Sequence, residues 1–201
     1  MSVSILQRAW YSYDAENKLT QVETSNDNVV WEKDARYSYY KQGPLARTIL
    51  GELQVQGIDY AYSIQGWLKG VNSTAVNEGN YDIGQDGKQG STNSLVARDV
   101  FGFSLNYFNG DYKQINNTTT AFTTSTFSLT NSSGVKTANP LYNGNIAAML
   151  VCIPKIGQVQ LYGYSYDQLN RIKSMDAFTG LNNSANTFTA TNSQNYKERI
   201  S

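Results

Sequence analysis

The chain reads, from Tyr162 to Met175, Tyr-Gly-Tyr-Ser-Tyr-Asp-Gln-Leu-Asn-Arg-Ile-Lys-Ser-Met. The tyrosines alternate with smaller residues, and residues two apart in an extended strand share one face of a sheet. Asp167 and Asn170 follow them. Such side chains cap the backbone of turns, and Asn tolerates the left-handed conformation that a tight turn needs. The stretch therefore predicts a β-hairpin whose second strand begins near Ile172.

The same pattern recurs near the start of the chain, in Tyr11-Ser-Tyr13-Asp14-Ala-Glu-Asn17-Lys18-Leu19. Degenerate copies lie between the two, with Gly-Pro or Gln-Gly at the turn in place of the Asx residues. A repeat of hairpin size indicates that the units stack on one another. We therefore predict one all-β segment of successive antiparallel hairpins that form a spiral strip or partial shell, with hairpins at about 9–24, 36–50, 57–72, 99–112 and 159–178 and polar loops at about 73–98 and 113–137.

Two apolar segments complete the predicted sheet. Asp99–Tyr112 alternates apolar and polar residues and contains Asn109-Gly110, which predicts a hairpin turn at that point. Ile146–Ile153 is the most apolar segment, and its periodicity fits either a buried strand or a short helix that ends at Pro154.

The composition narrows the range of possible functions. There are 16 basic and 16 acidic residues, so we expect no strong electrostatic attraction to nucleic acid or to an anionic membrane. Histidine is absent, which removes Ser-His and Cys-His nucleophile pairs and every histidine-containing metal site. No apolar run is long enough to span a membrane. We therefore predict a non-enzymatic protein with no catalytic residue, metal site or cofactor.

Two segments could suggest chemistry and are better explained by structure. Cys152 is the single cysteine and lies in an apolar run, which favours a buried, unreactive thiol. Asp82–Gly87 faintly resembles a calcium loop. However, Gly84 and Asn93 stand where such a loop needs a carboxylate and a bidentate Glu, which favours a plain loop.

At the level of motifs, the chain resembles a segment of an Rhs-type, YD-repeat protein. The hallmark of that family is Tyr-x-Tyr-Asp-x-x-Asn/Gly-Arg-Leu. It is carried here by two sets of residues: Tyr11, Tyr13, Asp14, Asn17, Lys18 and Leu19, and Tyr164, Tyr166, Asp167, Asn170, Arg171 and Ile172. Lys for Arg and Ile for Leu are the departures from the pattern. The blocks at 57–70 and 139–146 also look like those of Rhs-type proteins of Bacteroidetes.

The resemblance implies a structural role. In Rhs-type proteins, strips of hairpins are implied to close into a hollow shell around a C-terminal, often toxic, polypeptide. We therefore expect a shell segment of a larger secreted or cell-surface bacterial protein, whose partners are further repeats of the same polypeptide and the enclosed domain. The chain has no Asp-Pro-x-Gly motif of the kind that ends such shells, and Met1–Arg8 lacks the long apolar run of a signal peptide.

Two other function classes stay open at this stage. Exposed tyrosines and the rings of Trp10, Trp31 and above all Trp67 could stack on sugars, which would make the chain a carbohydrate-binding or adhesive module. The structural alternative is that these rings only cover the sheet.

A hydrolase would need two facing carboxylates. Asp14, Asp59 and Asp167 stand at what looks like the same point of repeated hairpins, so turn capping explains them. Lys18, Lys69 and Arg171 recur in the same way and are expected to pair with, or solvate, one face of the sheet.

Overall fold

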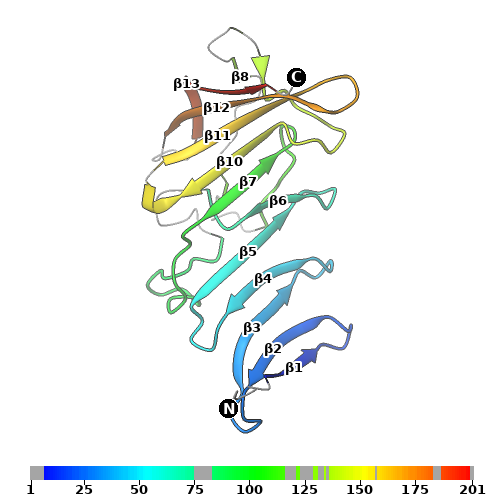
Figure 1. Ribbon diagram of the computed structural model, residues 1–201, viewed down its shortest axis with the longest axis vertical. Coiled ribbons are helices and arrows are strands. Elements are labelled where there is room, and N and C mark those ends of the chain that lie inside the picture. The colour runs from blue at the N-terminus through cyan, green and yellow to red at the C-terminus, as the bar shows by residue number, and fades with distance from the viewer. Residues whose placement is uncertain are drawn as a thin grey trace, which may run out of the picture. The chain divides into compact units, whose positions relative to one another are not determined.

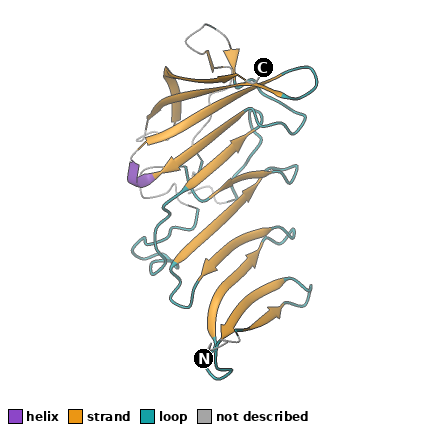
Figure 2. Ribbon diagram, in the orientation of Figure 1, coloured by secondary structure: helices purple, strands orange, loops and turns teal. Residues whose placement is uncertain are grey.

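The computed structural model describes residues 7–74, 83–115, 121–122, 129–130, 134, 136–156, 158–182 and 187–199. Their regular structure is antiparallel β-sheet with one 3₁₀ turn, which confirms the all-β prediction (Figures 1 and 2). The elements are β1 Arg8–Tyr13, β2 Leu19–Ser25, β3 Glu32–Tyr39, β4 Leu45–Leu50, β5 Gln56–Tyr62, β6 Leu68–Val71, β7 Gly102–Asn106, β8 Leu129–Thr130, β9 Lys136–Thr137, β10 Ala148–Ile153, η1 Pro154–Ile156, β11 Gln158–Tyr166, β12 Ile172–Asn182 and β13 Thr187–Arg199.

The chain falls into two compact units, Met1–Tyr60 with Gly84–Arg98, and Ala61–Ile83 with Asp99–Ser201. In the first unit the strands follow the order β1-β2-β3-β4-β5, where β5 belongs to this unit as far as Tyr60, and in the second the order β6-β7-β10-β11-β12-β13. The short strands β8 and β9 pair with each other in a separate two-stranded sheet. Each unit is therefore a run of antiparallel strands that follow the chain, and neither run closes on itself.

The hairpins share one turn geometry. In the β1–β2 hairpin the Asp14 N–H donates to the Lys18 carbonyl (2.9 Å) and the Asn17 N–H donates to the Asp14 carbonyl (3.0 Å). The β3–β4, β5–β6 and β11–β12 hairpins repeat both bonds at the matching positions. The fourth turn residue is left-handed in every case, with φ angles of 63° at Asn17, 109° at Gly43, 81° at Gly66 and 61° at Asn170. Asn and Gly tolerate this conformation best, which explains the Asn/Gly position of the repeat.

A second repeated feature precedes each turn. The strand register shifts by one residue at the second tyrosine of the β1–β2, β3–β4 and β11–β12 hairpins. The resulting pairs are Tyr13↔Leu19, Tyr39↔Leu45 and Tyr166↔Ile172. An irregularity at a fixed point of a repeat is a built-in bend that re-aims the neighbouring side chain.

The prediction of a hairpin at 99–112 is wrong. The Asn109-Gly110 turn does form, because the Asp111 N–H donates to the Phe108 carbonyl (3.2 Å), but residues 111–115 are not a strand. Instead β7 pairs with β10, with Ala148 opposite Asn106. The hairpin is thus interrupted by a long connection. Its return carries a left-handed Gly144 (φ 89°) two residues before Ile146, which matches the end of the repeated turn.

The core of the second unit lies on the face of β10, β11 and β12 that small and aliphatic residues occupy. The cluster comprises Ala138, Ala148, Leu150, Cys152, Val159, Leu161 and Phe178, each at most 2% exposed. Ile146–Ile153 is therefore a buried strand rather than a helix over the span of β10. On β7 the buried face is Gly102, Ser104 and Asn106, not the aromatic face, because loop residues such as Ser73 pack against it.

Candidate functional site

The first candidate site is the joint between successive hairpins. The tyrosine before a turn donates its hydroxyl hydrogen to a backbone carbonyl of the preceding hairpin, at the start of that hairpin's second strand or just before it. The bonds run from Tyr39 to Leu19 (2.8 Å), from Tyr107 to Leu68 (2.9 Å) and from Tyr166 to Ile146 (2.8 Å). We call this contact the tyrosine latch. It gives the second tyrosine of the sequence motif a specific task that periodicity alone does not reveal.

The predicted turn-capping carboxylates are confirmed at two positions. Asp14 Oδ1 accepts the N–H groups of Glu16 and Lys18, both at 2.9 Å. Asp167 Oδ1 accepts those of Leu169 (2.8 Å) and Arg171 (2.9 Å). The pKa of Asp167 lies below its ordinary value. The hydrogen bond from the Arg171 N–H is the largest cause and the bond from the Arg171 side chain is the second, because both stabilise the ionised carboxylate.

The prediction for Asp59 is wrong. Asp59 lies inside β5 rather than at the turn and is 5% exposed. The position that matches Asp14 in this hairpin is Ser63, whose Oγ accepts the Trp67 N–H at 3.2 Å. A hydroxyl can cap a turn as a carboxylate does. The turn geometry of the repeat is therefore retained in this hairpin, although Ser replaces Asp at the capping position.

Two of the predicted basic residues behave as expected. Lys18 forms an ion pair with Glu16 and lies 5.5 Å from the centre of the Tyr39 ring. Arg171 donates to Asp167 Oδ2 at 2.7 Å and is largely exposed. Lys69 also pairs with a carboxylate, that of Asp111 at 2.8 Å. It is only 4% exposed, however, and its predicted equivalence to Lys18 is wrong, because Trp67 is the residue that matches Lys18 in the turn.

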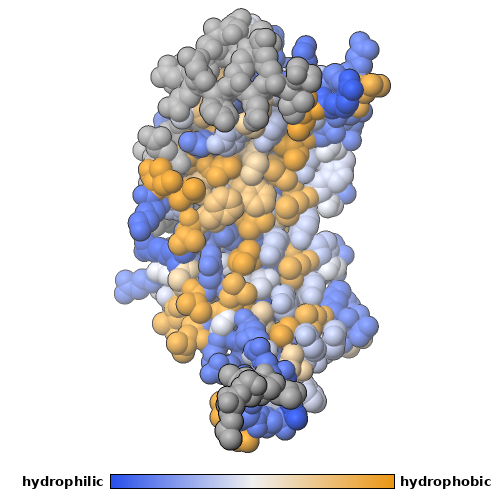
Figure 3. Space-filling view, viewed as in Figure 1, coloured by the Kyte–Doolittle hydropathy of each residue, from blue (hydrophilic) through white to orange (hydrophobic). Residues whose placement is uncertain are grey.

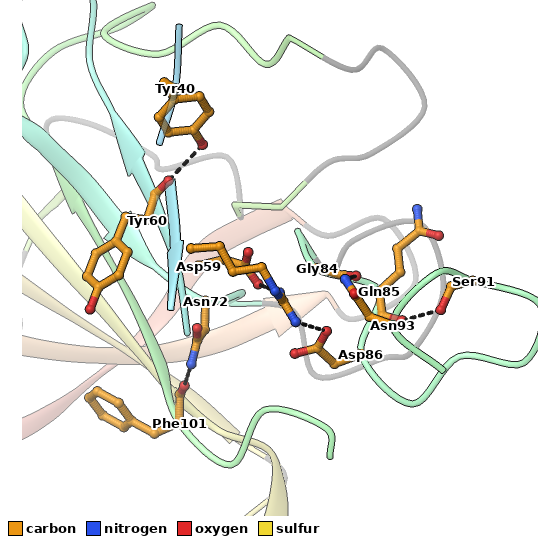
Figure 4. A network of polar contacts seen from close by, with 11 residues as sticks. Tyr40, Asp59, Tyr60, Asn72, Gly84, Gln85, Asp86, Ser91, Asn93 and Phe101 are labelled. Atoms are coloured by element: carbon orange, nitrogen blue, oxygen red, sulfur yellow. Dashed lines mark hydrogen bonds and ion pairs between the residues drawn. The ribbon is translucent and has the colours of Figure 1, made fainter. Parts of the chain in front are cut away.

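Asp59 belongs to a buried ionic cluster of the first unit (Figure 4). Arg47 on β4 donates through Nη1 to Asp59 Oδ2 and through Nη2 to Asp86 Oδ1 (2.5 Å). Burial alone lowers the pKa of Arg47, but the attraction of Asp59 and Asp86 outweighs it, so the pKa lies above its ordinary value. The cluster therefore fastens the loop that carries Asp86 to β4 and β5.

Glycines make room for this cluster. A Cβ at Gly57 would lie 2.2 Å from Arg47 Nη2, and a Cβ at Gly84 would lie 2.2 Å from Arg47 Nη1. The loop is also held by its own hydrogen bonds, among them Asn93 Nδ2 to the Gly84 carbonyl (2.7 Å; Figure 4). The Asp86 carboxylate that a calcium loop would use binds Arg47 instead, while Asp82 lies outside the described residues.

The second buried cluster joins β6 and β7 in the second unit. Lys69 Nζ donates to Asn106 Oδ1 at 2.7 Å and to the two Asp111 oxygens at 2.8 and 3.0 Å. Asp111 Oδ2 also accepts the Tyr107 N–H at 2.8 Å. Burial lowers the pKa of Lys69, against the opposing attraction of Asp111. No sequence signal points to this cluster, because its members are 37 and 42 residues apart.

The candidate sugar-stacking ring is partly covered. Trp67 is half-buried, and its ring centre lies 5.0 Å from that of Tyr107 at an interplanar angle of 51°. Trp10 is 61% exposed and meets Trp31 edge-on, with centres 6.4 Å apart. Part of the Trp67 ring is therefore covered by packing within the protein.

Cys152 is fully buried, as predicted, and burial raises its pKa to about 11. The thiol is therefore protonated at neutral pH and is a poor nucleophile. Within the described residues, no group of three or more His, Cys, Asp or Glu side chains is arranged to hold a metal ion. Nor does any described helix have the length and apolar character to cross a membrane.

Comparison with protein-family models gave no match, and a search of curated proteins also found no match.

Proposed function

We propose that this chain is a non-enzymatic structural segment of a β-sheet shell of the Rhs-type, YD-repeat kind. The observation that carries the proposal is the tyrosine latch. It recurs on three hairpins, one donor in the first unit and two in the second, with the donor just before one turn and the acceptor just after the turn of the preceding hairpin. A contact repeated in this way builds a strip, because each hairpin docks on its neighbour by the same rule.

The edge strand β1 supports a continuation of the strip. Among the described residues β1 pairs only with β2, and Trp10, Tyr11 and Tyr13 are 61%, 53% and 56% exposed. Tyr13 has the same place in its hairpin as Tyr39 and Tyr166 have in theirs. An unprotected edge of this kind invites a further strand. We propose that another hairpin of the same polypeptide covers it.

The buried charges fit a structural role. Arg47 is engaged with Asp59 and Asp86, and Lys69 with Asp111, so these groups bind one another in the interior of each unit. Over the face seen in Figure 3, apolar and polar side chains are interspersed. In the proposed parent protein, secreted or at the cell surface, the shell encloses a C-terminal toxin or effector domain.

The packing of Trp67 against Tyr107 favours this role over sugar binding. A glycan array with the wild-type chain and Trp67→Ala separates the two functions. We expect no glycan to bind the wild type. Binding that is lost in Trp67→Ala, with the strand content unchanged by circular dichroism, would establish the carbohydrate-binding module instead.

The experiment for the shell is limited proteolysis of the natural polypeptide that contains this chain. We expect a C-terminal segment that resists protease in the intact protein and is digested once the shell is opened with denaturant. A natural polypeptide that consists of this chain alone, or a C-terminal segment digested at the same rate with and without denaturant, would refute the shell.

A further inference from the structure

Two side chains lie within hydrogen-bonding distance of the Lys69 amine nitrogen: the carboxamide of Asn106 and the carboxylate of Asp111. Lys69 Nζ lies 2.7 Å from Asn106 Oδ1, and Oδ1 is bonded directly to the carboxamide carbon Cγ. The same nitrogen lies 2.8 and 3.0 Å from the Asp111 oxygens, within the range in which a carboxylate acts as a general base. Nucleophile, acceptor and base are therefore already in contact.

The surroundings favour reaction over simple pairing. Lys69, Asn106 and Asp111 are 4%, 2% and 5% exposed, so water is excluded from the amine and from any amide it forms. Burial also disfavours the charged amine and lowers the pKa of Lys69. A proton can therefore pass from the ammonium to Asp111, which leaves a neutral amine beside the carboxamide.

The leaving group is poorly held. Asn106 Nδ2 is buried and has no hydrogen-bond partner among the described residues. A buried N–H group without a partner is costly, so the native state is relieved when this group departs.

We propose that Lys69 and Asn106 join in an intramolecular isopeptide bond, with Asp111 as the proton carrier. Asp111 takes a proton from the Lys69 ammonium, and the neutral Nζ attacks Asn106 Cγ. The Nζ–Cγ bond forms, the Cγ–Nδ2 bond breaks, and Asp111 delivers the proton to the departing nitrogen. The second proton lost by Nζ also ends on that nitrogen. The products are a secondary amide and one ammonium ion, and Asp111 is regenerated.

The bond would fasten β6 to the end of β7, the strand whose hairpin is interrupted. It closes a covalent loop between residues 37 apart, and such a cross-link stabilises a fold mainly by restricting the unfolded chain. This inference goes beyond the shell and does not depend on it. A shell segment without the bond would refute the bond and leave the shell intact. A cross-linked protein with another role would refute the shell and leave the bond intact.

The test is a mass spectrum and peptide map of the purified, folded chain. We expect a mass below that of the sequence by one ammonia, no tryptic cleavage after Lys69, and one branched peptide that joins the Lys69 and Asn106 segments. Loss of ammonia alone is insufficient, because the Asn109-Gly110 and Asn143-Gly144 sequences can also lose ammonia by forming a succinimide. The branched peptide, sequenced by fragmentation, is the deciding observation.

Variants identify the groups. Lys69→Arg, Asn106→Ala and Asp111→Ala should each lack the branched peptide. Lys41→Arg, which changes an exposed lysine at a turn, should retain it. The wild-type map decides even if a buried variant fails to fold. A folded wild-type chain with separate Lys69 and Asn106 peptides would overturn the proposal, and so would a branch from Lys69 to Asp111 with loss of water.

Discussion

The Tyr39 hydroxyl donates a 2.8 Å hydrogen bond to the carbonyl oxygen of Leu19, which begins the second strand of the preceding hairpin. The same relationship joins Tyr166 to Ile146 at 2.8 Å. In both cases the donor and acceptor are 20 residues apart, which is the stretch of chain from just after one turn to just before the next. The latch therefore ties the repeat in the sequence to the stacking of hairpins in space.

Tyr39→Phe removes this hydrogen bond and little else. The net loss should be about 0.5–1.5 kcal/mol, the usual contribution of one intramolecular hydrogen bond. Urea unfolding followed by circular dichroism measures it. Tyr142→Phe is the matched control, since Tyr142 is 73% exposed. Equal unfolding midpoints for the two variants would mean that the latch contributes nothing to stability.

Asn17 tests the left-handed turn position, at a φ of 63°. Asn17→Ala should lower the free energy of unfolding by about 1–2 kcal/mol, because a Cβ without a polar side chain disfavours this conformation. Asn17→Gly should be nearly neutral, since glycine adopts positive φ without strain. Thermal unfolding of both variants checks the order. The idea fails if Ala is tolerated as well as Gly.

Arg47→Met tests the buried ionic cluster. It leaves Asp59 and Asp86 buried without their cation, and removal of one partner from a buried ion pair typically costs about 3–5 kcal/mol. Arg171→Met removes an exposed partner of Asp167 and should cost at most about 1 kcal/mol. Chemical denaturation compares the two variants. Equal losses would show that the Arg47 cluster is no more important than a surface pair.

Cys152 should be inert in the folded protein. With the pKa raised to about 11 and the side chain fully buried, an aromatic disulfide reagent at mildly alkaline pH should label the thiol only as the protein unfolds. The labelling rate should rise with urea in parallel with unfolding. Rapid labelling in native buffer would contradict the burial of β10 in the core.

The sequence predicts local features of this fold well. Alternating tyrosines and the Asx or Gly turn residues depend on neighbours along the chain, so the hairpins with turns at Asn17 and Asn170 could be identified directly. The capping roles of Asp14 and Asp167 follow for the same reason, since each carboxylate binds N–H groups at most four residues away.

Long-range features could not be predicted. Asn109-Gly110 forms its turn as expected, but the strand that pairs with β7 after this turn is the distant β10, and no local sequence pattern indicates that pairing. Asp59 also adjoins a tyrosine pair, but it precedes the pair whereas Asp14 and Asp167 follow theirs, and in the fold Arg47 on the neighbouring strand binds it in the interior. Lys69 likewise depends on Asp111, 42 residues away. Buried polar clusters are specified by the completed fold rather than by spacing.

The most direct measurement of the central claim is the structure, by electron cryomicroscopy, of the natural polypeptide that contains this chain. We predict that β1 pairs with a strand of a further Tyr-x-Tyr hairpin, that the Tyr13 hydroxyl donates to a carbonyl of that hairpin, and that the strip surrounds a C-terminal domain. A β1 edge that faces solvent, with no hairpin beyond it and nothing enclosed, would contradict the claim.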